Sequence, residues 1–183
     1  MISLALPAVV AGRGEDMNDQ VVELNSPGLW LLLYSPFAVK ELEEGGDYRR
    51  RFPDGRDLVD YVNACRFGAI ALRFPTQDHW LHLSATMDQS VIARASDHVR
   101  LGVEVWDHQL CVRGGDDLFS WQRACPDEQL ITLDNGLYNV TACMVPHDGA
   151  GPVRIYLHFA STFALPELGY HRVPQLYCET PVR

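Results

Sequence analysis

The sequence lacks the motifs by which several common enzyme classes are recognised. It contains no G-x-S-x-G, H-E-x-x-H, G-x-G-x-x-G or Walker A pattern, so nothing marks a hydrolase of the α/β type, a zinc protease or a nucleotide-binding enzyme. It also has no apolar run long enough to span a membrane as a helix. We therefore expect a protein that is not an enzyme and that uses no cofactor or metal.

Basic residues are scarce. The chain has 15 Lys and Arg against 24 Asp and Glu, for a net charge of −9, and Lys40 is its only lysine. Binding to phosphates requires basic charge, so this balance disfavours nucleic acid and anionic membrane as ligands. It favours a basic protein partner, whose approach it would accelerate. The alternative is that the acidic charge serves solubility alone.

Paired cysteine motifs are absent as well. No C-x-x-C occurs, and the number of cysteines is odd and their spacing wide: Cys65, Cys111, Cys125, Cys143 and Cys178. This usage is typical of reduced thiols in the cytoplasm rather than of a disulfide framework. The apolar stretch at residues 2–9 predicts a first strand. Its alternative, a cleaved signal peptide, lacks a basic start and is followed by Glu15 and Asp16.

What is present is a series of short apolar runs separated by Gly, Pro and Asp clusters, within a length of 183 residues that suits one domain, 1–183. The predicted strands are 2–9, 29–35, 68–74, 80–86, 99–106, 109–113, 129–134, 137–145 and 153–160. The one predicted helix is short and lies near Asp57 to Cys65. The fold class we expect is all-β: an antiparallel two-sheet β-sandwich with one short helix.

Two tight turns are predicted from the alternation of side chains. With Asn135-Gly136 as a two-residue turn, Leu133 faces Tyr138 and apolar residues meet on one face of a hairpin. With Asp107-His108 as a turn, a second hairpin forms in the same way. The first register sends Asn139, Thr141 and Cys143 outward, and it places inside Tyr138, Val140, Ala142 and Met144.

The next strand continues this sheet. To bring its apolar face beside Met144, that residue must lie opposite Val153, which places Thr141 opposite Tyr156 and Asn139 opposite His158. The outer face would then be polar. It is our alternative site for a small ligand, formed by Thr141, Arg154, Tyr156 and His158.

Glycosylation, metal binding and cysteine-based catalysis have less support in the sequence. Asn139-Val140-Thr141 is a glycosylation sequon of a length common by chance. The spacing of Cys143 and His147, or of His79 and His82, does not make ligands converge on a strand. A calcium site at the sandwich loops stays open as part of the same alternative as the small-ligand site; it would use Asp107, Asp116 and Asp117, which have no fixed loop spacing. An enzyme built on Cys143 and His158 would require a close thiol–imidazole pair that the predicted register does not give.

Two acidic clusters remain as candidate partner-binding sites. One is the loop containing Glu41, Glu43, Glu44 and Asp47. The other is the stretch "GGDDLFSW", with Asp116, Asp117, Phe119 and Trp121. Carboxylates beside exposed aromatic side chains suit an interface with a basic partner. The alternative is a solvated loop whose two aromatic side chains turn into the core.

The region from about Val99 to Phe159 resembles a group of small bacterial β-sandwich proteins. The resemblance rests on "VRLGVEVWDHQL", "ITLDNGLYNVTACMV" and "GPVRIYLHF" and covers about a third of the chain. The group includes the inhibitor of a competence-associated nuclease and immunity proteins that neutralise toxins. It implies a non-enzymatic inhibitor that binds its cognate toxin in the cytoplasm. Together with the acidic charge and the lack of catalytic motifs, it leads us to expect an immunity protein that occludes or displaces the active site of a basic toxin, a nuclease. No catalytic residue is implied.

Overall fold

The computed structural model describes residues 20–25, 30–40, 42–48, 56–73, 78–84, 89–95, 97–145 and 153–177. Within these residues ten strands form two five-stranded sheets whose apolar faces share one core. In spatial order, sheet A contains β1 (Gln20–Asn25), β4 (Asp78–Ser84), β9 (Val153–Thr162), β8 (Gly136–Val145) and β5 (His98–Val105). Sheet B contains β10 (Gln175–Tyr177), β3 (Gly68–Arg73), β2 (Trp30–Tyr34), β6 (Gln109–Gly114) and β7 (Leu130–Thr132).

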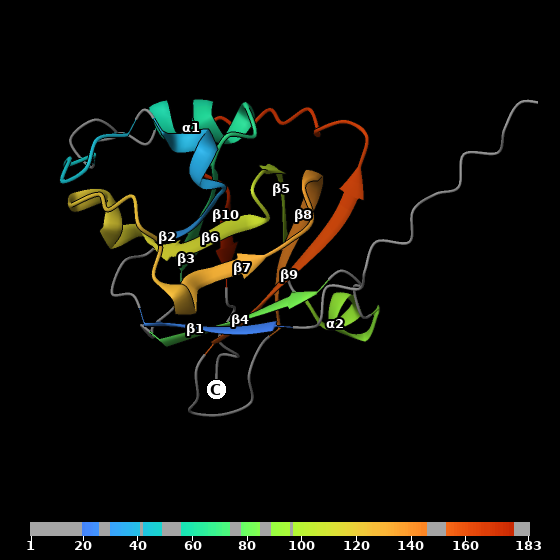
Figure 1. Cartoon of the computed structure of the whole chain (residues 1–183). Coiled ribbons are helices and arrows are strands. Elements are labelled where there is room, and N and C mark those ends of the chain that lie inside the picture. The colour runs from blue at the N-terminus through green and yellow to red at the C-terminus, as the bar shows by residue number, and fades with distance from the viewer. Residues whose placement is uncertain are drawn as a thin grey trace, which may run out of the picture.

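Short helices complete the fold. They are α1 (Arg56–Asn63), α2 (Gln89–Arg94) and three 3₁₀ turns: η1 (Pro36–Val39), η2 (Gly115–Phe119) and η3 (Asp127–Gln129). In Figure 1, α1 lies at one end of the sandwich and α2 lies on the opposite side, beside the end of β4. The predicted all-β two-sheet fold is confirmed. Two neighbouring pairs, β4 with β9 and β3 with β10, are parallel.

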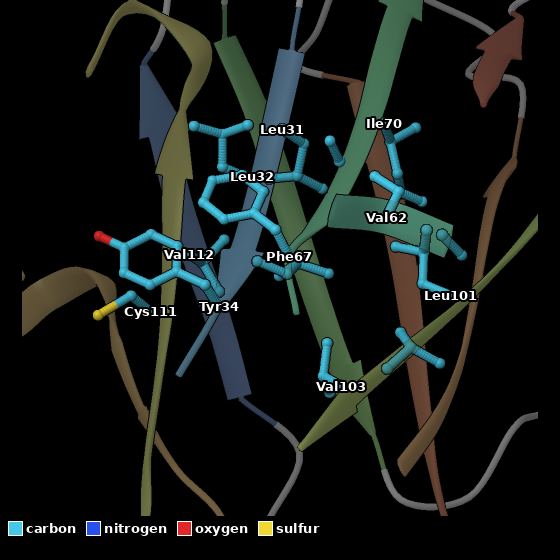
Figure 2. Close-up of a cluster of buried hydrophobic side chains, with 14 of the residues drawn as sticks. Leu31, Leu32, Tyr34, Val62, Phe67, Ile70, Leu101, Val103, Cys111 and Val112 are labelled. Atoms are coloured by element: carbon cyan, nitrogen blue, oxygen red, sulfur yellow. The ribbon is translucent and has the colours of Figure 1, made fainter. Parts of the chain in front are cut away.

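The core follows the alternation of the sequence. The predicted inner residues of β8 are all buried: Tyr138, Val140, Ala142 and Met144. Tyr138, Val140 and Ala142 belong to the shared core, to which strand β2 of sheet B contributes Leu31, Leu32 and Leu33. Figure 2 shows part of this core, with Leu31 and Ile70 from sheet B and Leu101 and Val103 from β5 of sheet A. Burial of such side chains contributes roughly 1.5–3 kcal/mol each, which makes this the main stabilising layer.

The predicted hairpin at Asn135-Gly136 is wrong. Strand β7 ends at Thr132 and pairs with β6 in sheet B, whereas β8 pairs with β5 and β9 in sheet A. The short link therefore crosses from one sheet to the other. The alternation of apolar side chains is the same in either case, because both strands present one face to the same core.

A second crossing lies beside the first. Asp107 and His108 do form a tight turn, with φ values of 55° and 57°, but only Trp106 and Gln109 pair across it before β5 and β6 diverge into different sheets. The His108 N–H donates to Asn135 Oδ1 at 2.9 Å, and the Leu133 N–H donates to the His108 carbonyl at 3.2 Å. The two crossings thus hold each other together.

The β8–β9 register differs from the prediction by two residues. Met144 pairs with Ile155 rather than Val153, and Thr141 pairs with His158 rather than Tyr156. A slip of two residues leaves every side chain on its predicted face, so the apolar pattern cannot distinguish the two registers.

Cys143 lies on the predicted outer face of β8, but it is not exposed there as expected. Its side chain is fully buried, and helix α2, which the sequence did not predict, contacts β8. Strands β1 and β10 were not predicted either. The predicted strand at 2–9, together with Glu41, His147 and Cys178, lies outside the described residues.

Candidate partner-binding surface

The two acidic segments predicted from the sequence lie directly against each other. The Gly45 N–H donates to the Trp121 carbonyl at 2.7 Å, and the Trp121 N–H donates to the Gly46 carbonyl at 3.0 Å. A third bond runs from the Tyr48 N–H to the Leu118 carbonyl at 2.7 Å. In Figure 1 both segments, cyan and yellow, lie at the same end of the molecule. Segments 42–48 and 115–123 thus form one surface, which we call the acidic face.

One arginine links the two segments further. The Arg123 N–H donates to Glu44 Oε2 at 2.8 Å, and Arg123 Nε donates to the Leu42 carbonyl at 3.2 Å. These bonds fix the orientation of the Glu44 carboxylate. They also place one positive charge among the acids, so the face is strongly but not uniformly negative.

The predicted acidic residues occupy different positions on this face. Glu43, Glu44 and Asp47 are exposed, and Asp116 is half-buried. Glu41 lies outside the described residues. The structure therefore brings four of the predicted carboxylates into one region open to solvent.

The two predicted aromatic anchors separate. The Phe119 side chain is 45% exposed, while Trp121 is fully buried. The Trp121 ring packs against Tyr34 and Phe67, with centroids 5.1 and 6.4 Å away, and edge-on against Tyr48. Trp121 therefore takes the alternative position considered from the sequence. It supports the acidic face from beneath, and it offers no contact surface to a partner.

The Asp117 carboxylate is bonded to a buried side chain, that of Arg113. It accepts a hydrogen bond of 2.7 Å from Arg113 Nε, and Arg113 is only 2% exposed. The Arg113 guanidinium also donates to Tyr34 Oη at 3.2 Å and to the Gln122 carbonyl, and it lies over the Trp121 ring. Burial alone would lower the pKa of Arg113, but the bonds to Asp117 and Tyr34 raise it overall. The role of Asp117 is to neutralise a buried charge.

An exposed aromatic residue that the sequence did not single out lies nearby along the chain. Trp106 is 52% exposed at the crossing turn, with its Nε1 donating to Glu104 Oε1 at 2.8 Å. Its ring lies 5.7 Å from that of Phe37 in η1. The predicted turn at Asp107-His108 could have indicated this exposure, because a tight turn ends the strand and leaves the preceding residue at the surface.

The outer-face residues of the small-ligand alternative, Thr141, Arg154, Tyr156 and His158, do lie on neighbouring strands and are at least partly exposed, with Thr141 opposite His158. The calcium site and the enzyme built on Cys143 and His158 receive no geometric support. Asp107 precedes β6 and Asp116 follows it, so the two carboxylates lie roughly 17–20 Å apart along an extended strand and cannot share one calcium ion. Within the described ranges, no three His, Cys, Asp or Glu side chains are placed to hold a metal ion. Cys143 is buried, which raises its thiol pKa, and its partner on β9 is Tyr156 rather than His158. None of the helices in the described part of the chain is both long and apolar enough to cross a membrane.

Comparison with known proteins gives distant structural similarity alone. No protein-family model matches the sequence, and no curated protein sequence matches it. A crystal structure of ComJ from Bacillus subtilis, an inhibitor of the DNA-degrading activity of NucA, is similar at 12% identity and a TM-score of 0.49, covering 78% of this chain and 96% of ComJ. A solved structure of crocagin biosynthetic gene J is similar at 13% identity and a TM-score of 0.42, covering 78% of this chain and 98% of the other.

Proposed function

We propose that this protein is an inhibitor that binds a basic protein toxin, a nuclease, in the cytoplasm and blocks its active site. The observation that carries the proposal is the acidic face. Two segments some seventy residues apart in sequence are joined by backbone hydrogen bonds, and they present Glu43, Glu44, Asp47 and Asp116 beside the exposed ring of Phe119.

The chemistry of a nuclease explains why such a face would suit it. A nuclease must bind phosphates, so the surface around its active site carries basic side chains. Carboxylates on a rigid loop pair can occupy the positions of those phosphates, and opposite charges accelerate the encounter. A half-exposed aromatic ring such as Phe119 provides the apolar anchor that charges alone do not.

Rigidity of the face favours tight binding. The Glu44 carboxylate is already oriented by Arg123, and the loop holding it is bonded to the segment around Trp121. A surface that is ordered before binding loses less conformational entropy when the complex forms.

Co-expression with the toxin encoded beside its gene tests this function. We expect the protein to protect the cell and to purify together with the toxin. Unchanged toxicity together with no co-purification would contradict the proposal.

A further inference from the structure

A cleft lies at the side of the sandwich where β5, an edge strand of sheet A, contacts β10, an edge strand of sheet B. Its volume is about 360 Å³, which falls within the range of roughly 300–1,000 Å³ that is typical of small-molecule sites. The polar and aromatic side chains that line it are His98, Tyr170, His171, Arg172, Gln175 and Tyr177. The cleft shares no residue with the acidic face.

The segment that forms one wall of the cleft is held at both ends. The Tyr170 N–H donates to Asn63 Oδ1, and the Tyr170 carbonyl accepts from Asn63 Nδ2, both at 2.9 Å. The Tyr170 hydroxyl accepts from the Arg100 N–H at 3.3 Å and donates to the Arg100 carbonyl at 2.8 Å. Further along, the Pro174 carbonyl accepts from the Ala71 N–H of β3 at 2.8 Å. The wall is therefore ordered without a ligand, which lowers the entropy cost of binding one.

The opposite side chains come from the start of β5 and from β10. The His98 N–H donates to Asp97 Oδ1 at 2.8 Å, which fixes the start of β5. The Tyr177 hydroxyl donates to Gln175 Oε1, so the oxygen of that amide is occupied and its NH₂ group is the end that can donate to a ligand. These two strands therefore supply nitrogen donors to the cleft.

The lining is basic although the chain as a whole is acidic. Arg172 is exposed and brings a guanidinium charge, and the imidazoles of His98 and His171 add ring nitrogens. None of the described residues that line the cleft is an Asp or a Glu, whereas the chain has a net charge of −9. Donors gathered in this way suit a small anion, whose oxygens accept charge-assisted hydrogen bonds.

Two phenol rings give the cleft flat apolar surface as well. Tyr177 is 45% exposed, and Tyr170 is partly exposed with its hydroxyl held at Arg100. Aromatic side chains stack on other planar rings, with a gain beyond simple burial of area. A ligand that uses all of these groups combines an anionic group with a planar ring.

We propose that this cleft binds a small organic anion that carries a planar ring, either a nucleoside monophosphate or an aromatic carboxylate. Arg172 and the two imidazoles hold the phosphate or carboxylate oxygens, the Gln175 amide donates to a polar group of the ligand, and the Tyr177 ring packs against the planar ring. The site is separate from the acidic face, so its test does not depend on the proposed function.

Isothermal titration of the full-length protein tests the proposal. The probes are adenosine monophosphate and 4-hydroxybenzoate, the uncharged analogues adenosine and 4-hydroxybenzamide, and inorganic phosphate, which has no ring. At least one of the two ring-bearing anions should bind about tenfold or more tightly than its uncharged analogue and than inorganic phosphate. The one that binds more tightly identifies the source of the anion. No binding of either ring-bearing anion, or equally tight binding of inorganic phosphate, would overturn the proposal.

Variants test the two halves of the site with the anion that binds. Arg172→Gln should weaken binding by about tenfold or more, whereas Lys40→Gln, which removes an exposed charge outside the cleft, should change it by less than about twofold. Tyr177→Leu should weaken binding by about fivefold, and Tyr177→Phe, which keeps the ring, should bind within about threefold of the wild type. Wild-type affinity in Arg172→Gln, or an equal loss in Arg172→Gln and Lys40→Gln, would contradict the site.

Discussion

Arg113 is the residue on which the acidic face depends most. Its guanidinium is buried, and its charge is balanced by Asp117 at 2.7 Å. A buried charge without a partner is far more costly than the same charge with one. The bonds from Arg113 to Tyr34 and Gln122 then tie β2 and the segment after η2 to one point.

Asp117→Ala should therefore destabilise the fold, although the side chain was predicted to contact a partner. We expect a loss of about 2–3 kcal/mol in the free energy of unfolding, measured by urea denaturation, because the buried charge of Arg113 loses the carboxylate that balances it. Asp127→Ala is the matched control. Asp127 is exposed, and its removal should change stability by less than about 0.5 kcal/mol. Equal effects of the two substitutions would contradict the role given to Asp117.

At the scale of elements, the sequence predicts which face of a strand is buried better than it predicts which strands lie beside it. Alternation identified β8 and its buried side chains, because burial on one face fixes the period of two. It could not tell that β7 and β8 belong to different sheets, since a strand facing the core looks the same in either sheet. Helix α2 and the three-residue strand β10 were not predicted because they are too short to show a period in the sequence.

The acidic face illustrates the same limit. The sequence identified the carboxylates of both segments, but their proximity arises from long-range bonds such as that from Gly45 to Trp121. The sequence could not show that Trp121 lies inside and Phe119 outside either. Phe119 ends a 3₁₀ turn and Trp121 follows it, so no regular strand or helix period assigns their faces.

The C-terminal segment depends on a close approach to β5. A Cβ atom on Gly102 would lie 2.5 Å from Cys65 Sγ and 2.7 Å from Pro166 Cδ. Gly102→Ala should therefore force the segment around Pro166 outward and lower stability by about 1–3 kcal/mol, measured by denaturant unfolding. Gly169→Ala, whose Cβ would meet nothing within 4 Å, is the control and should be nearly neutral. A neutral Gly102→Ala would show that the segment does not pack as described.

At the scale of the whole molecule, the buried thiols and the buried Tyr34 phenol predict how stability depends on pH. Burial raises the pKa of the Cys65 and Cys143 thiols above 9.0 and that of the Tyr34 phenol above 10.0. The unfolded chain then loses these protons at lower pH than the folded chain does. Their contribution to stability is complete below pH 9 and is lost as the pH rises above it. The lowered pKa of Cys125 has the opposite effect on stability, but it concerns one group only.

We therefore expect the Tm to fall on the alkaline side, by at least about 5 °C between about pH 8 and pH 10.5. Circular dichroism at a series of pH values checks this. A Tm that is constant or rises over the range would contradict the burial of these side chains.

The central claim is that the acidic face binds a basic nuclease, and titration of the nuclease encoded beside the gene tests it most directly. The double variant Glu43→Lys/Glu44→Lys loses the bond from the Arg123 N–H to Glu44, so it should stay folded with a slightly lower Tm. It should weaken binding by about 100-fold or more, mainly through slower association. Glu167→Lys reverses an exposed charge in the C-terminal segment and should change affinity by less than about threefold. Equal affinities for the wild type and the double variant, or an equal loss in both variants, would contradict the claim.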